Sequence, residues 1–190
     1  MLTIRKSLLA ALISAALPFA SAHAGLMGST ATSQYYAYGS TYNGSGSPTT
    51  FTVDGGAHAQ FFNYFNITVT NNQIIFDYNG ASTSWSDSAV SLNSAGLFIE
   101  NGNLLSFSGA DAINTVTLDP ATNLVGFGAG NLSFNSNQIA VNWVNLVFNP
   151  NSQVVLNVNT TGEVPVPATF ALIGLGALGL LRRSRSTLNR

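Results

Sequence analysis

Hydrophobic and polar residues alternate along much of the chain between residues 25 and 163. The clearest apolar series are Ile67/Val69, Ile74/Phe76/Tyr78, Leu132/Phe134, Ile139/Val141/Trp143 and Val154/Leu156/Val158. Because successive side chains of a β-strand point to opposite faces, a period of two predicts strands with one face in a core. The pattern predicts roughly nine to eleven short strands with these residues buried.

Turn-forming residues separate the apolar series. The signals are Asn43-Gly44, Asp54-Gly55-Gly56, Asn79-Gly80, Asn101-Gly102, Asp119-Pro120 and Asn149-Pro150. Gly, Asn, Asp and Pro favour the backbone conformations of tight turns, whereas no long stretch of this region has the period of an amphipathic helix. We therefore expect an all-β body, built as an antiparallel β-sandwich or a jelly roll.

One segment of this body is echoed later in the chain. Residues 66–78 (NITVTNNQIIFDY) align without gaps with residues 131–143 (NLSFNSNQIAVNW), with identity at Asn66/Asn131, Asn72/Asn137, Gln73/Gln138 and Ile74/Ile139. Each copy has the pattern of a strand, a polar turn and a strand, which predicts two equivalent hairpins. Duplication and chance similarity within a low-complexity sequence are both open explanations.

The N-terminus has the features of a secretory signal peptide. Residues 1–24 combine the basic pair Arg5 and Lys6 with an apolar run at 8–17 and small residues at Ala22 and Ala24. These are the n-region, the h-region and the cleavage site of such a signal, so we expect a signal helix that is removed after Ala24. An uncleaved N-terminal anchor is the alternative.

A second apolar run, at residues 168–181, precedes Arg182, Arg183 and Arg185. As a helix it would be about 21 Å long, which is short for a hydrocarbon core of roughly 30 Å. We expect a short transmembrane helix whose arginines stay in the cytoplasm, with residues 25–163 outside. An ordinary tail anchor would have the same orientation.

The C-terminal segment resembles the PEP-CTERM protein-sorting signal of Gram-negative bacteria. Its three parts occur in the family's order: the motif Val164-Pro165-Val166-Pro167-Ala168-Thr169, an apolar helix from Phe170 to Leu181, and the arginine cluster. Val166 is a departure, since the family usually has Glu there. The resemblance implies processing by an exosortase, a membrane protease. The expected parts are therefore the signal peptide (1–24), an exported β-sandwich domain (25–163) and the sorting signal (164–190).

Charge is distributed very unevenly between these parts. Residues 25–163 contain no Lys or Arg, and their acidic residues are Asp54, Asp77, Asp87, Glu100, Asp111, Asp119 and Glu163. Without cations the body lacks the usual means of binding phosphate, so we do not expect nucleic acid as a partner. The chain has no cysteine, which excludes disulfides and thiolate chemistry.

No catalytic, metal-binding or cofactor-binding residues are predicted in the body. Its only histidine, His58, follows the turn that contains Asp54; this pair lacks a third metal ligand, and we expect His58 on a polar surface loop. Glu100, in an expected hairpin turn, and Asp77, Asp87 and Asp111 are the carboxylates available to a glycosidase or to calcium. Gly174 to Gly179 satisfy GxGxxG but lack the βαβ context of a dinucleotide site.

Aromatic residues are concentrated in the first part of the body. They are Tyr35, Tyr36, Tyr38, Tyr42, Phe61, Phe62, Tyr64 and Phe65. Core packing is the expected role for most of them, although exposed rings could stack on sugars.

The favoured function is that of an exported, non-enzymatic structural or adhesive protein of the cell surface or extracellular matrix. The protein is first anchored in the membrane and then processed. Exosortase and the secretion machinery are the expected partners, and the family's association with exopolysaccharide producers makes exopolysaccharide and biofilm the expected setting. The alternatives are a carbohydrate-binding module and a small hydrolase.

Overall fold

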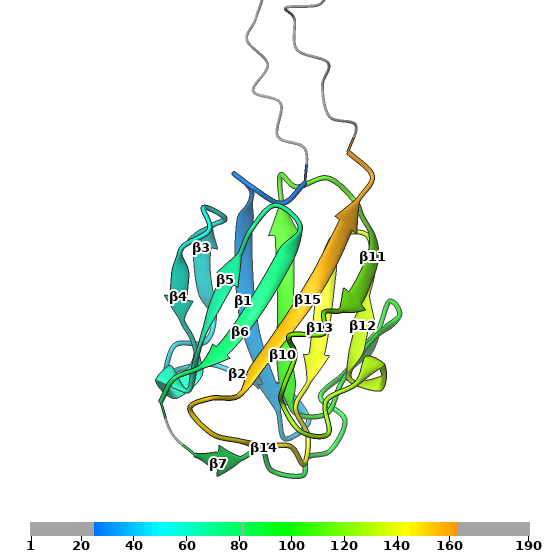
Figure 1. Cartoon of the computed structure of the whole chain (residues 1–190). Helices are drawn as coiled ribbons and strands as arrows, with labels where there is room; N and C mark the ends of the chain where they lie inside the picture. The colour runs from blue at the N-terminus through cyan, green and yellow to red at the C-terminus, as the bar shows by residue number, and fades with distance from the viewer. Residues whose placement is uncertain (1–24, 81, 163–190) are drawn as a thin grey trace, which may run out of the picture.

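The computed structural model describes residues 25–80 and 82–162, which form two antiparallel β-sheets that face each other (Figure 1). Sheet A has the strand order β12 (Leu132–Phe134), β13 (Gln138–Asn142), β10 (Gly102–Ser108), β1 (Thr30–Ala37), β2 (Ser40–Tyr42), and β3 (Thr49–Thr52) also pairs with β1. Sheet B has the order β11 (Ile113–Leu118), β15 (Gln153–Thr160), β6 (Gln73–Tyr78), β5 (Phe65–Val69), β4 (Ala57–Ala59). The all-β, antiparallel prediction is confirmed.

Four shorter strands form two ribbons beside the main sheets. One ribbon pairs β7 (Thr83–Ser84) with β14 (Val147–Phe148), and the other pairs β8 (Leu92–Ser94) with β9 (Leu97–Ile99). Two 3-10 turns, η2 (Phe61–Asn63) and η3 (Ala129–Asn131), complete the described elements. The part of the chain that the structure describes contains no helix long and apolar enough to cross a membrane. The predicted signal helix and transmembrane helix lie outside the described residues.

The core lies between the two sheets, as a sandwich requires. Sheet A contributes Leu105, Phe107, Ile139 and Val141, and sheet B contributes Ile67, Ile74, Phe76, Val154, Leu156 and Val158. Trp143, directly after β13, is fully buried and packs edge-on against Phe76, with ring centroids 5.1 Å apart. These facing apolar surfaces fit the predicted sandwich, whereas the jelly-roll variant and the domain boundaries stay predictions.

The period-two prediction holds best in sheet B and fails in part of sheet A. In β5 and β6 the predicted residues are buried and their neighbours are more exposed. Phe134, predicted to be buried, is 37% exposed in β12. In β13, Ala140 and Asn142 are buried as well as Ile139 and Val141, because Leu97 and Ile99 of the β8–β9 ribbon cover the outer face of the sheet.

The Asn101-Gly102 turn prediction is wrong. Asn101 is fully buried, and Gly102 is the first residue of β10, opposite Asn142 of β13 and Tyr36 of β1. A Cβ atom at Gly102 would collide with the carbonyl oxygen of Val141 and lie 3.0 Å from the Cα of Asn142. Glycine serves here to let two strands approach closely rather than to make a turn.

The two echoed segments form equivalent hairpins, one in each sheet. Ile67 pairs with Phe76 in β5–β6, and the corresponding Leu132 pairs with Val141 in β12–β13. The equivalence extends to the third strand, since Ile74 faces Leu156 of β15 and Ile139 faces Leu105 of β10.

The same equivalence extends to the hairpin turns. The carbonyl oxygens of Asn72 and Asn137 accept backbone hydrogen bonds from Val158 (2.8 Å) and Phe107 (2.9 Å), respectively. The prediction of matched hairpins is therefore confirmed, and the structure adds that their registers and neighbouring strands also correspond.

Candidate functional site

An aromatic pocket of about 260 Å³ lies where β1, β2, η2 and the segment after β7 meet. Its apolar lining consists of Tyr35, Tyr38, Tyr42, Phe61, Phe62, Tyr64 and Trp85. Ser84, Ser86 and Asn101 are its polar lining residues. None of these side chains is ionised at neutral pH, so the pocket combines aromatic surface with uncharged hydrogen-bonding groups.

The floor of the pocket is closely packed and hydrogen-bonded. Tyr35, Phe61 and Trp85 are each buried, and the rings of Tyr35 and Phe61 stack with centroids 4.0 Å apart. Trp85 is fixed by its backbone N–H, which donates to Leu146 (2.8 Å), and by its indole N–H, which donates to the hydroxyl of Tyr78 (3.1 Å). Because these side chains are already held in place, ligand binding would not incur the entropy cost of ordering them.

Two aromatic side chains at the rim are exposed. Tyr38 is 66% exposed and Phe62 is 51% exposed. Both residues have a positive φ, 56° for Tyr38 and 50° for Phe62, a conformation that is rare and costly for bulky residues. Tyr38 and Gly39 are the two turn residues between the paired Ala37 and Ser40, a position where Asn-Gly is the favoured pair.

The polar side of the pocket is a connected network. The hydroxyl of Tyr35 donates to Oδ1 of the buried Asn101, whose Nδ2 donates to the backbone oxygen (3.0 Å) and Oγ (3.2 Å) of Ser86. Oγ of Ser86 is also 3.1 Å from the hydroxyl of Tyr38. Burial raises the pKa of Tyr35 well above its usual value, so its phenol keeps its proton and stays a hydrogen-bond donor.

The sequence indicated only part of this pocket. The aromatic group contained six of its lining residues, and the structure divides that group between core and rim: Tyr35, Phe61 and Phe65 are buried, whereas Tyr38 and Phe62 are exposed. The other four lining residues, Ser84, Trp85, Ser86 and Asn101, were missed. No sequence signal marked Trp85 or Ser86, and Asn101 was interpreted as a turn residue.

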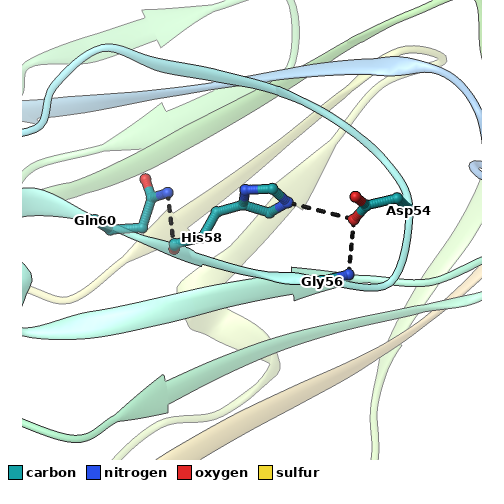
Figure 2. A network of polar contacts seen from close by, with 4 residues as sticks. All are labelled: Asp54, Gly56, His58 and Gln60. Atoms are coloured by element: carbon teal, nitrogen blue, oxygen red, sulfur yellow. Dashed lines mark hydrogen bonds and ion pairs between the residues drawn. The ribbon is translucent and has the colours of Figure 1, made fainter.

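His58 does not lie on a surface loop, as was expected. It belongs to β4, its side chain is 26% exposed, and its ring stacks on Phe51 of β3 with centroids 4.0 Å apart. Figure 2 shows its imidazole directed at Asp54, with 3.6 Å between Nε2 and Oδ1. The Gly56 N–H, which donates to Asp54, lowers the pKa of that carboxyl, and His58 adds to the effect. The arrangement orients the β3–β4 turn.

Three other acidic side chains, those of Asp87, Glu100 and Asp111, accept hydrogen bonds within the fold. Oδ2 of Asp111 accepts the N–H of Gly25 (2.8 Å), and Glu100, which is half-buried, accepts a bond from Asn142 (3.3 Å). Asp77 lies in β6, and Asp87 accepts the N–H of its neighbour Ser88 (3.1 Å). Within residues 25–80 and 82–162 no group of three or more His, Cys, Asp or Glu is placed to hold a metal ion.

Asp119 provides a test of how these carboxylates stabilise the body. The N–H of Ala121 and Nδ2 of Asn157 each donate to it at 2.9 Å, and these bonds lower the pKa of Asp119. The ionised Asp119 carboxylate therefore stabilises the folded state fully above the ordinary pKa of 3.8. This stabilisation is lost as the pH falls through the lower pKa that Asp119 has in the folded protein. Between about pH 5 and pH 2, the melting temperature of the Asp119→Asn variant should therefore fall by less than that of the wild type. Thermal unfolding followed by circular dichroism measures this, and equal losses would contradict it.

The predicted signal cleavage residues Ala22 and Ala24, the motif Val164 to Thr169, and Arg182, Arg183 and Arg185 all lie outside the described residues. Residues 163–186 match a family model described as the PEP-CTERM protein-sorting motif. No curated protein and no solved structure matches the chain. The match begins shortly after β15, which ends at Thr160.

Proposed function

We propose that the β-domain is a structural or adhesive component of the cell surface or the extracellular space, because the PEP-CTERM sorting motif marks the chain for export and for sorting by an exosortase. The observation that carries this proposal is the sorting motif at residues 163–186. It follows a folded body whose described part contains no Lys or Arg. The proposed role is non-enzymatic and belongs to a biofilm or exopolysaccharide matrix.

The proposed route includes a membrane-bound stage. The signal peptide of residues 1–24 directs export, and the apolar run at 168–181 holds the chain in the membrane until the exosortase acts. Arg182, Arg183 and Arg185 keep the tail in the cytoplasm, since cationic flanks orient short spans. Processing then releases the body without the apolar tail, and Val166 replaces the usual Glu of the motif without preventing recognition.

Sorting can be tested with the triple variant Arg182→Ser, Arg183→Ser and Arg185→Ser. We expect most of the variant to stay in cells instead of reaching the surface or medium, because the orientation signal is gone. The measurement is immunoblotting of cell, membrane and medium fractions, with mass spectrometry of both ends of the recovered protein. The wild-type product should lack residues from about Thr169 onward.

Arg190→Ser is the matched control, because Arg190 lies outside the matched segment, and it should sort normally. Extracellular wild-type protein that still carries Arg190 would contradict processing. Normal sorting of the triple variant would contradict the role of the arginines.

The aromatic pocket favours a second candidate function, carbohydrate binding. Its exposed rings and uncharged polar groups are the combination that a sugar requires, since a sugar ring has both C–H faces and hydroxyl edges. This function is compatible with a matrix protein and can be tested separately from sorting.

A further inference from the structure

We infer that the aromatic pocket binds one ring of an uncharged saccharide, with Tyr38 and Phe62 as the stacking faces and Ser86 as a polar contact. This inference deepens the second candidate function and does not depend on how the tail is processed. The volume of about 260 Å³ is below the range of about 300–1,000 Å³ that is common for drug-sized ligands, which suits a single sugar ring.

The electrostatics of the site select an uncharged ligand. No lining residue carries a charge, and residues 25–162 contain no Lys or Arg that could pair with a carboxylate or phosphate. An anionic ligand would lose hydration without gaining an ionic partner. A wholly apolar ligand would cover the exposed Ser84 without satisfying its hydroxyl. A neutral, hydroxyl-rich ring avoids both costs.

The rim supplies the apolar contact. Tyr38 has no ring partner within the described residues, and its hydroxyl contact with Ser86 holds an otherwise exposed side chain. Phe62 lies against Phe61 edge-on (4.5 Å) and reaches solvent with about half of its surface. Each ring offers a flat apolar face to the C–H face of a pyranose, and the polar lining residues of the pocket lie beside these rings.

The backbone at both rim residues argues that the rings are there for binding rather than folding. A left-handed conformation at Tyr38 and Phe62 costs stability that Asn would largely avoid, because its short polar side chain tolerates this region. Neither ring recovers the cost through full burial. Strained, exposed aromatic residues beside a well-packed pocket are typical of a functional site.

Aromatic pockets also bind quaternary ammonium ions. Such a cation needs several ring faces directed at one point. In this pocket the Tyr35 and Phe61 faces are stacked on each other, and Tyr42 meets Phe61 edge-on at 5.1 Å. The exposed rings are the two at the rim, Tyr38 and Phe62, and these suit stacking on the faces of a sugar ring.

The experiment uses the purified full-length protein in a detergent that has no sugar head group. Glucose, galactose, mannose, N-acetylglucosamine and cellobiose are titrated while tryptophan fluorescence is recorded, because Trp85 lines the pocket. Glucuronate and choline are the charged comparisons. We expect saturable binding of at least one neutral sugar. The rim variants Tyr38→Asn and Phe62→Asn should weaken it at least about tenfold, as for a central aromatic contact.

Both rim variants suit their left-handed backbone, so their melting temperatures should equal or exceed that of the wild type. Phe98→Thr is the matched control, because Phe98 is a 39% exposed aromatic residue of β9 outside the pocket. It should bind like the wild type. Absence of saturable binding by every neutral sugar, binding of glucuronate or choline alone, or unchanged affinity in both rim variants would overturn the inference. Because no step depends on the tail, this result is independent of the sorting assay.

Discussion

Replacing Trp143 by alanine is expected to lower the free energy of unfolding by about 3–5 kcal/mol. Trp143 is fully buried, and its ring lies 5.1 Å from that of Phe76 and 5.3 Å from that of Phe127. Its indole N–H donates to Oδ1 of the buried Asn103 at 3.0 Å. Truncation therefore opens a cavity between the sheets and leaves a buried acceptor without its partner.

Urea unfolding of the purified protein measures this loss. Trp143→Phe separates the two causes, because it keeps most of the ring volume but removes the donor, and it should cost about 1–3 kcal/mol. Phe134→Ala is the control for an aromatic residue that is 37% exposed, and it should cost about 1 kcal/mol or less. A loss below about 1 kcal/mol for Trp143→Ala would show that this residue is not a core residue.

Gly102→Ala is expected to destabilise the protein by about 3 kcal/mol, although it adds only one methyl group. The new Cβ would collide with the carbonyl oxygen of Val141 and lie 2.9 Å from its carbonyl carbon. Both are backbone atoms, so β10 and β13 would have to separate where Gly102 pairs with Asn142. The shift would also displace the neighbouring Asn101, which lines the aromatic pocket. The variant should therefore also bind the proposed sugar ligand more weakly.

Gly130→Ala is the matched control, since a Cβ there would meet no atom within 4 Å and its φ is not positive. Its effect on the urea midpoint should be within about 0.5 kcal/mol. If Gly102→Ala is as stable as this control, the close approach of the strands does not limit stability.

The regular part of the fold could be predicted because alternation reports directly on which side of a strand is buried. Ile67, Ile74 and Val154 were assigned to the core in this way, and they are fully buried. The echoed sequences similarly indicated matched hairpins, because both copies place a short polar turn, ending in the same Asn-Gln pair, between two strand patterns. Phe134 was mispredicted because strand periodicity cannot show whether a second sheet faces that position.

The pocket could be predicted only in outline. Its rim aromatics lie in two neighbouring segments of the sequence, whereas Trp85, directly after β7, and Asn101, directly before β10, come from more distant segments. Asn101-Gly102 has the composition of a turn. Only the tertiary structure shows that Gly102 allows two strands to pack closely and that Asn101 belongs to a buried hydrogen-bond network. The sorting motif, in contrast, is local in sequence and was identified from its residues alone.

The position of β15 has a consequence for the order in which the domain is completed. β15 is the last strand of the described body along the chain, yet it lies between β6 and β11 in sheet B (Figure 1). As the exported chain emerges on the far side of the membrane from its N-terminus onward, all strands of sheet A can pair before residues 153–160 arrive. Until then β6 and β11 each present an unpaired edge, the feature that invites association with other chains. The nascent protein therefore needs shielding from aggregation until its final strand, directly before the sorting motif, fills that gap.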